Sequence, residues 1–426
     1  MSDASLDVWR EVGGEFQRVG AISGGRFAYS TVYLESDNAA AISLNLPLGE
    51  EPFDARRTSA FFRGLLPEGE TWSDFVGMLR SEGGGYTKVL EGLRNETVGA
   101  LVFGERPSWD EASYEPLGGD VLRRLAKIPQ RAVVELGMRT RKSLAGAQPK
   151  VGLYHAGSDV DRGWHVPLGI APSTHIVKNP NKLFPGDSVY EALCCEVTRL
   201  LDLPVAETEL IRIDGNEPLL AVKRFDRVFE GSGRTLDGLR VPLRLHQEDM
   251  CQASGFSGEF KYEPTGACYA NRCSVLAARG MRGVYNTTMV LFYMLCLDFV
   301  LGNCDNHLKN RSLLWNEGWT GFALAPFYDI TNTTLYPGLD REMGISFGGS
   351  RKIDDVTPLM IMETGESCGI PRDVAWALFE EIAEESGPAI ERAGQNLADK
   401  GFPDAVKAAR RLLADADGRR SLAGKR

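Results

Sequence analysis

The stretch Asp305-Asn306-His307-Leu308-Lys309-Asn310, followed downstream by Phe327-Tyr328-Asp329, is the most informative part of this sequence. An Asp with an Asn five positions later, and then a second Asp, is the spacing of a kinase phosphoryl-transfer site. In that chemistry the first Asp takes the proton of the attacking hydroxyl, and the Asn and second Asp hold Mg²⁺ against the ATP phosphates. We therefore expect Asp305 to be the base and Asn310 and Asp329 to be the Mg²⁺ ligands.

The surroundings of this stretch favour the catalytic interpretation. A bare Asp-x-x-x-x-Asn spacing is common by chance. Here it follows an apolar helical pattern and Gly302, contains His307, and is followed at suitable distance by a second Asp. A neutral His307 could hydrogen-bond a phosphate or orient Asp305, whereas the ordinary alternative is a satisfied loop histidine.

Length and composition exclude several classes of protein. The 426 residues are too many for one small core, so two or three domains or lobes are expected. A net charge of −10 argues against a broad, non-specific nucleic-acid surface. The eight Cys form no C-x-x-C pair, which indicates reduced thiols. The polar N-terminal segment resembles no secretory signal, and the apolar run 289–301 is too short to span a bilayer, so we expect a cytoplasmic protein without membrane contact.

The pattern along the chain predicts an α+β protein with a two-lobe, kinase-like fold. We expect an N-terminal α+β subdomain over 1–110, a β-rich lobe over 119–230 and an all-helical lobe over 240–426. ATP would lie in the cleft between the lobes. The expected strands are 27–34, 39–46, 151–154, 164–166, 174–178 and 219–225, and the expected helices include 188–201, N-capped by Ser188, 289–301 and 373–385.

Three earlier segments could supply the ATP contacts. The small-residue loop Ser143-Leu144-Ala145-Gly146-Ala147-Gln148-Pro149-Lys150 would let backbone N–H groups approach phosphates, although it matches no standard glycine-rich motif. Lys178 ends an apolar strand and suits a point-charge contact to phosphate. The segment Lys223-Arg224-Phe225 occupies the hinge position, and Asp226 and Arg227 after it are expected to form structural ion pairs.

The helical partner of Lys178 stays open between two glutamates. Kinases pair the strand Lys with a Glu on the next helix. Glu191 is preferred because the chain has just entered that helix, and Glu196 competes one turn later.

These motifs together resemble the HipA family, the serine/threonine kinase toxins of bacterial toxin–antitoxin modules. The resemblance covers most of the chain in the same order and is carried by 143–150, 174–178, 221–227, 245–252, 302–310 and 326–330. It implies an ATP- and Mg²⁺-dependent kinase in the bacterial cytoplasm. It also implies a small helix-turn-helix antitoxin as partner, operator DNA contacted only through that antitoxin, and an aminoacyl-tRNA synthetase as protein target.

The resemblance also implies roles for individual residues. Asp305, His307 and Asn310 would form the catalytic loop, Asn310 and Asp329 would bind Mg²⁺, and Ser143 matches the autophosphorylated serine that silences the family's enzymes. The implied ATP contacts are Ala145, Gly146, Ala147, Gln148, Pro149, Lys150, Lys178, Lys223, Arg224, Phe225, His307, Lys309, Asn310, Tyr328 and Asp329.

Three positions depart from the family pattern, and two other functions stay open. Pro149 stands where a Glu is familiar, Asn306 replaces a Gly, and Lys223 replaces a Glu. The same loop also suits a small-molecule or lipid kinase. A non-catalytic kinase-fold co-repressor is the third hypothesis. The complete set of expected ligands argues against it: Lys178, Asp305, Asn310 and Asp329.

Overall fold

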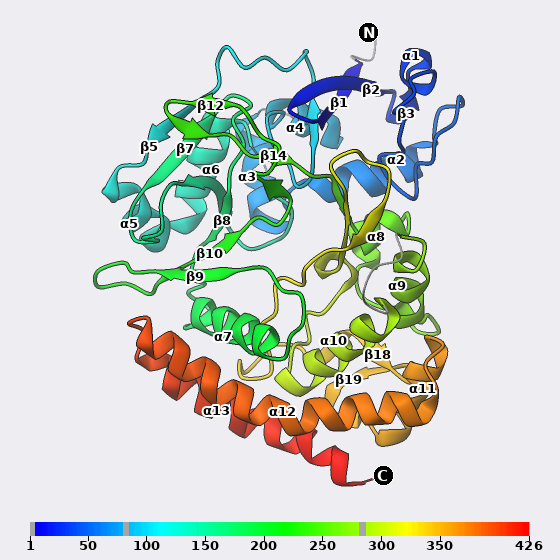
Figure 1. The fold of residues 1–426 in the computed structure, drawn as a ribbon, viewed down its shortest axis with the longest axis vertical. Coiled ribbons are helices and arrows are strands. Elements are labelled where there is room, and N and C mark those ends of the chain that lie inside the picture. Colours follow the sequence, from blue (N-terminus) through cyan, green and yellow to red (C-terminus); the bar gives the residue numbers. More distant parts are fainter. Residues whose placement is uncertain (1–4, 80–84, 143, 281–286, 426) are drawn as a thin grey trace. The chain divides into compact units, whose positions relative to one another are not determined.

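The structure is a computed structural model that describes residues 5–79, 85–142, 144–280 and 287–425. The chain divides into two compact units (Figure 1). Unit 1 comprises Met1–Asn181, Glu209–Gly258 and Leu314–Phe322, and unit 2 comprises Lys182–Thr208, Glu259–Leu313 and Ala323–Arg426. The three-part division predicted from the sequence stays a prediction.

Unit 1 is the β-rich part of the protein. An antiparallel sheet has the order β3-β2-β1-β4, and a second sheet has the order β5-β7-β6-β8-β10-β9. The strands of these sheets are β1 (Leu6–Val12), β2 (Glu15–Ser23), β3 (Arg26–Tyr29), β4 (Leu101–Phe103), β5 (Ser113–Pro116), β6 (Lys150–His155), β7 (Trp164–Leu168), β8 (His175–Lys178), β9 (Thr208–Ile211) and β10 (Leu219–Lys223). The remaining elements are α1 (Thr31–Leu34), α2 (Ala55–Phe62), α3 (Gly69–Met78), α4 (Gly85–Gly92), α5 (Gly119–Lys127), α6 (Pro129–Thr140), β11 (Arg227–Val228), β12 (Thr235–Leu236), β13 (Leu239–Arg240), β14 (Leu243–Arg244), β15 (Gln247–Asp249) and α8 (Met250–Ala253).

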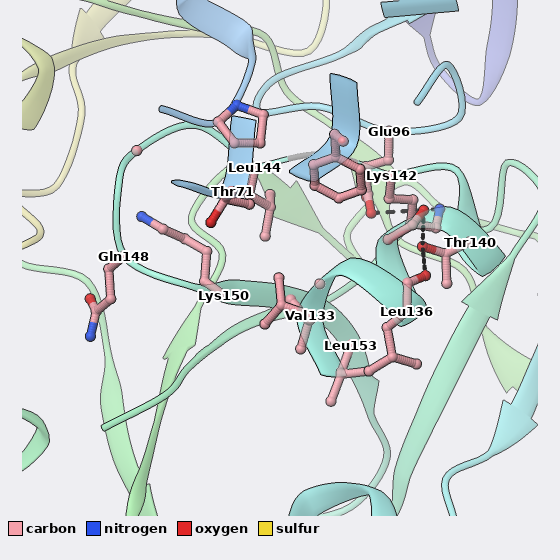
Figure 2. Close-up of a pocket in the computed structure, with 16 residues that line it drawn as sticks. Thr71, Glu96, Val133, Leu136, Thr140, Lys142, Leu144, Gln148, Lys150 and Leu153 are labelled. Carbon is pink, nitrogen blue, oxygen red and sulfur yellow. Dashed lines mark hydrogen bonds and ion pairs between the residues drawn. The ribbon is translucent and has the colours of Figure 1, made fainter. Parts of the chain in front are cut away.

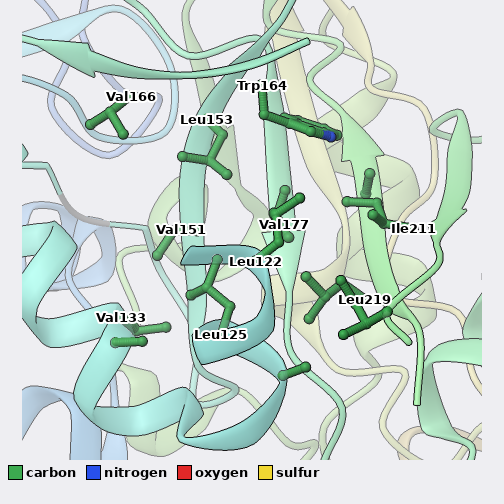
Figure 3. Close-up of a cluster of buried hydrophobic side chains, with 14 residues drawn as sticks. Leu122, Leu125, Val133, Val151, Leu153, Trp164, Val166, Val177, Ile211 and Leu219 are labelled. Atoms are coloured by element: carbon green, nitrogen blue, oxygen red, sulfur yellow. The ribbon is translucent and has the colours of Figure 1, made fainter. Parts of the chain in front are cut away.

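One hydrophobic core cluster of unit 1 lies between the six-stranded sheet and the helices α5 and α6 (Figure 3). In β6, β7 and β10 the members of this cluster lie two residues apart, as the two-residue period of a strand requires. Leu122 and Leu125 of α5 and Val133 of α6 pack against them. The other members of the cluster include Val151, Leu153, Trp164, Val166, Val177, Ile211 and Leu219.

A buried cluster of charges joins four segments of unit 1. Glu96 Oε1 lies 3.0 Å from the Arg227 guanidinium and accepts the Ser173 N–H at 2.9 Å, and Glu96 Oε2 lies 3.6 Å from Lys142 Nζ. Arg224 donates to both Asp226 oxygens, at 2.8 and 2.7 Å. These ion pairs confirm the structural role predicted for Asp226 and Arg227. Burial by itself raises the pKa of Glu96, but Lys142 and the nearby Arg side chains lower it well below the ordinary value of 4.5.

Unit 2 is mainly helical. Its helix α10 is apolar on all sides and buried, as predicted for 289–301, and it packs against α9, α12 and α13. The elements here are α7 (Asp187–Leu200), α9 (Tyr269–Ala277), α10 (Thr287–Leu301), β18 (Glu342–Phe347), β19 (Ser350–Lys352), α11 (Pro358–Ser367), α12 (Arg372–Asp399) and α13 (Asp404–Arg420), and β16 (Ser312–Trp315) and β17 (Phe322–Leu324) cross the boundary between the units. No helix among the described residues combines the length and apolarity needed to cross a membrane.

The fold class is confirmed, with a β-rich N-terminal region and a helical C-terminal part, but that part is not all-helical. Strands β14 to β19 fall within 240–426. In β18 the apolar residues Met343, Ile345 and Phe347 recur with a period of two, although the residues between them are buried as well. Gly348 and Gly349 turn the chain into β19 with positive φ. Two-residue periodicity and a Gly-Gly turn produce a hairpin.

Three smaller expectations are wrong. The strand expected over 27–34 ends at Tyr29 as β3, and Thr31–Leu34 form the helix α1, because the Ser30 side chain caps it by accepting the Tyr33 N–H. Residues 39–46 form no strand, because side chains satisfy their backbone groups: Tyr33 binds Ala40, and Tyr29 Oη accepts the Ile42 N–H at 3.0 Å. Ser188 is not an N-cap, because α7 begins at Asp187 after Gly186, whose φ of 82° ends the preceding turn.

We expect Glu96→Gln to destabilise the protein by about 3–5 kcal/mol, because it leaves buried cations without their shared carboxylate. The free energy of unfolding would be measured by urea denaturation. The stabilising effect of the ionised carboxylate is fully present above pH 4.5 and is lost as the pH falls further, since the folded-state pKa is the lower one. The difference in free energy of unfolding between wild type and Glu96→Gln should therefore become smaller below pH 4.5.

Glu135→Gln is the matched control, because Glu135 makes exposed ion pairs with Arg124 and Arg131. An equal loss of stability in both variants would contradict the special role of Glu96.

Candidate active site

The predicted phosphate loop leads directly into β6. Gly146 has a φ of 109°, a conformation that favours glycine, and its carbonyl accepts the Glu68 N–H at 3.0 Å. Figure 2 shows Gln148 and Lys150 on this loop, beside a pocket that also contains the Glu96–Lys142 ion pair. Ser143, the predicted autophosphorylation residue, lies outside the described residues.

The two predicted phosphate-binding lysines face each other across paired strands. Lys150 of β6 is the register partner of Lys178 of β8, and Lys178 is also opposite Leu220 of β10. Lys178 is buried, with 4% of its surface exposed. Central placement in an antiparallel ladder holds its backbone rigidly, as a positioned cation requires.

The hinge segment is closely tied to the sheet. The Arg224 N–H donates to the Thr174 carbonyl at 2.9 Å, and its guanidinium belongs to the buried charge cluster. The side chain of Arg224 is thus structural. Lys223 ends β10 and is exposed, and Phe225 is half-buried. Their adenine contacts stay a prediction.

The two candidate partners of Lys178 differ in their environment. Glu196 accepts hydrogen bonds from Arg199 at 2.6 Å and from Asn396 at 2.7 Å, which gives it a structural role inside unit 2. Glu191 is buried on the same helix, α7. This difference supports the preference for Glu191 without testing the pairing itself.

In unit 2 the predicted catalytic loop is closed by its own hydrogen bonds. Asn310 Nδ2 donates to the Asp305 carbonyl at 2.8 Å, and the His307 N–H donates to the same carbonyl at 2.9 Å. The structure thus places the predicted base and the predicted metal ligand on one compact turn. The Asp305 side chain is 48% exposed and so accessible to an acceptor hydroxyl.

The end of the loop is anchored to the core through Asp298. This buried carboxylate of α10 pairs with Arg311 and accepts a hydrogen bond from Asn303 Nδ2 at 2.7 Å. The Arg311 guanidinium also lies 5.1 Å from the centre of the Phe327 ring. One buried ion pair therefore connects α10, the predicted catalytic loop and the segment before Asp329.

The unusual Asn306 has a clear structural role. Its side chain is fully buried, and Oδ1 accepts the N–H groups of Gly344 at 2.7 Å and Ile345 at 3.1 Å. An Asn at this position attaches the catalytic loop to β18, which a Gly cannot do.

His307 is neutral in this environment. Burial lowers its pKa to about 4, even though Asp305 acts in the opposite direction. Its Nε2 lies 3.6 Å from Asp305 Oδ1. At neutral pH an uncharged imidazole therefore lies beside the predicted base.

Asp329 lies just beyond a segment bound to the loop. Tyr328 Oη donates to the Lys309 carbonyl at 2.7 Å and lies 2.6 Å from Ser312 Oγ. Asp329 itself has a φ of 56°. A non-glycine residue in this region costs free energy and often marks a functional position.

The donor set of this turn fits a magnesium ion. Because the amide nitrogen of Asn310 is bound to Asp305, its Oδ1 is the atom left to act as a ligand. Amide and carboxylate oxygens are the hard ligands that Mg²⁺ prefers, and the ion retains waters and phosphate oxygens in its other positions.

The sequence matches the models of two protein domains: the HipA N-terminal domain over residues 7–104 and the HipA-like C-terminal domain over residues 142–390. The chain belongs to the HipA family. It is a HipA-like serine/threonine-protein kinase of the toxin–antitoxin type.

Individual relatives support this family assignment. The chain is 30% identical to the protein named "Putative kinase Y4mE" of Sinorhizobium fredii over 96% of its own length and 92% of that protein. It is 25% identical to the serine/threonine-protein kinase toxin HipA of Shewanella oneidensis, over 79% of this chain and 77% of the relative. The solved complex of Shewanella oneidensis HipA with HipB and its operator DNA matches in fold, with a TM-score of 0.77 and 23% identity over 97% of this chain and 96% of that chain.

Two residues that support the predicted site lie outside the motifs recognised in the sequence, Asp298 and Tyr262. Asp298 could have been recognised from the sequence, because a charged residue inside an apolar helix needs a buried partner. Tyr262, whose Oη donates to Asp305 Oδ1 at 2.6 Å, could not have been recognised in this way, since it belongs to no recognised motif.

We expect Lys178→Met to weaken binding of Mg²⁺-ATP. Loss of one charge-assisted hydrogen bond costs about 1.5–3 kcal/mol, which is about tenfold to 100-fold in Kd. Calorimetric titration with a non-hydrolysable ATP analogue measures the effect. The exposed Lys182→Met is the control and should bind as wild type. Equal affinity of wild type and both variants for the ATP analogue would show that Lys178 does not contact the nucleotide.

Proposed function

We propose that this chain transfers the γ-phosphoryl group of ATP to a Ser or Thr hydroxyl of a target protein, and that it acts in this way as the toxin of its module. The compact turn from Asp305 to Asn310 carries the proposal. It combines an accessible carboxylate with a neutral histidine and an amide oxygen available to a metal.

The proposed roles follow from the chemistry of phosphoryl transfer. Asp305 accepts the proton of the acceptor hydroxyl. At the same time the hydroxyl oxygen bonds to the γ-phosphorus, and the bond between that phosphorus and ADP breaks. Asn310 and Asp329 would hold Mg²⁺, which supplies charge neutralisation at the phosphates. In unit 1, Lys178 and the loop from Ala145 to Lys150 would hold the ATP phosphates.

The target and the partners are proposed from the family. We infer that the acceptor belongs to an aminoacyl-tRNA synthetase, whose modification would stop translation and growth. The HipA of Shewanella oneidensis was crystallised with HipB and operator DNA. We propose a small helix-turn-helix antitoxin as the partner here too. With its net charge of −10, the chain would reach operator DNA only through that antitoxin.

Asp305→Asn is expected to lower phosphate transfer by about 10²–10⁴-fold, the usual contribution of a general base, and to abolish growth arrest. The measurement compares phosphoproteomes of cells that express wild type or variant. Asp354→Asn, which alters an exposed ion pair with Arg341, is the control and should act as wild type.

Retained transfer in Asp305→Asn would refute the assignment of the base. Label from γ-labelled ATP appearing in a metabolite or lipid, and in no protein, would instead support the alternative of a small-molecule kinase.

Ser143→Ala is expected to prolong activity. A phosphate at Ser143 would carry nearly two negative charges beside a loop that receives ATP phosphates, and would repel them. Intact-mass spectrometry during incubation with ATP should show wild type gaining a phosphate as its activity falls. The variant should stay active, and the exposed Ser158→Ala should follow wild type. The same loss of activity in Ser143→Ala would rule out self-silencing through this serine.

A further inference from the structure

Tyr262 makes a short hydrogen bond to the proposed base. Its Oη lies 2.6 Å from Asp305 Oδ1, a distance typical of a hydroxyl that donates to an ionised carboxylate. The residue precedes α9 and is 43 positions from Asp305 in the chain.

The backbone on both sides of Tyr262 is attached to the catalytic loop and its support. The Lys261 carbonyl accepts the Leu308 N–H at 3.1 Å, and the Glu263 N–H donates to the Gly344 carbonyl at 2.9 Å. Gly344 in turn donates to Asn306 of the loop. The Tyr262 segment and the loop therefore hold a fixed relative position.

The ring of Tyr262 is also restrained. It meets the His307 ring edge to face, with centroids 5.1 Å apart and an interplanar angle of 78°. The Lys261 ammonium and the Arg351 guanidinium each lie 5.5 Å from its centre. The hydroxyl direction is thus set by packing as well as by the backbone.

This arrangement restricts the base itself. The last torsion of an Asp side chain is soft, so an exposed carboxylate can rotate. The Tyr262 hydroxyl, by donating to Oδ1, fixes the plane of the Asp305 carboxylate. His307 Nε2 lies 3.6 Å from the same oxygen. Among the described residues, no side chain or backbone group donates to Oδ2, which is therefore the oxygen available to an acceptor hydroxyl.

We propose that Tyr262 is a positioning residue for phosphoryl transfer. It holds one oxygen of Asp305 so that the other faces the acceptor hydroxyl. The inference rests on the proposed function, because it requires Asp305 to be the base. Tyr262 touches neither substrate nor cofactor in this role, so its loss slows the chemical step and leaves ATP binding unchanged.

The test is Tyr262→Phe, which keeps the ring and removes the hydroxyl. Transfer of labelled phosphate from ATP would be followed to dephosphorylated casein and to the chain itself. We expect kcat to fall at least tenfold while the KM for ATP changes less than twofold. An unchanged KM also shows that the variant is folded.

Tyr269→Phe is the matched control. The Tyr269 hydroxyl belongs to the same segment but donates to the Phe260 carbonyl, at 2.7 Å, and not to Asp305. This variant should retain the wild-type kcat. An equal fall in both variants would mean that any hydroxyl of this segment is structural.

Two other outcomes overturn the inference. Unchanged kcat in Tyr262→Phe would show that Asp305 needs no such donor, and a raised kcat would show that the tyrosine hydroxyl occupies the acceptor position. Absence of labelling by the wild-type chain is a different result, because it refutes the proposed function.

Discussion

The buried carboxylate of Glu96 is the interaction on which the architecture of unit 1 depends. It binds the Ser173 N–H just before β8, Lys142 just before the phosphate loop, and Arg227 just after β10. Cations removed from water are costly unless a carboxylate compensates them, so these segments are confined to one arrangement. That arrangement is the one that places Lys150 opposite Lys178.

In unit 2 the same physical constraint acts around the predicted catalytic loop. Asp298 holds Arg311 at the end of the loop, Asn306 binds β18 in its middle, and Tyr262 reaches Asp305 at its beginning. Buried polar groups need partners, and Asp298 and the amide oxygen of Asn306 find theirs in residues 13 and 38 positions away. The result is an exposed carboxylate on a rigid support, as catalysis requires.

Elements whose hydrophobic pattern is encoded locally were predicted correctly, and elements that depend on contacts with other segments were not. Strands such as β6, β7, β8 and β10 and the apolar helix α10 have clear periodicity, because hydrophobic burial is encoded locally. β1 was missed because Arg10 and Glu11 occupy buried positions and hide its alternation. Residues 39–46 were misassigned because the hydroxyls of Tyr29 and Tyr33, not a partner strand, bind backbone groups of Ala40 and Ile42.

The sequence by itself predicted the chemistry, because Asp305, Asn310 and Asp329 have the spacing expected of a phosphoryl-transfer loop. Local chain geometry brings Asp305 and Asn310 onto one turn. Only the tertiary structure decided what holds that turn. Whether Glu196 is structural, what Asn306 binds, and which group orients Asp305 depend on contacts between residues tens of positions apart. Hydrogen bonds of this kind leave no periodic pattern in a sequence, because they require a matching group in space and not at a fixed spacing.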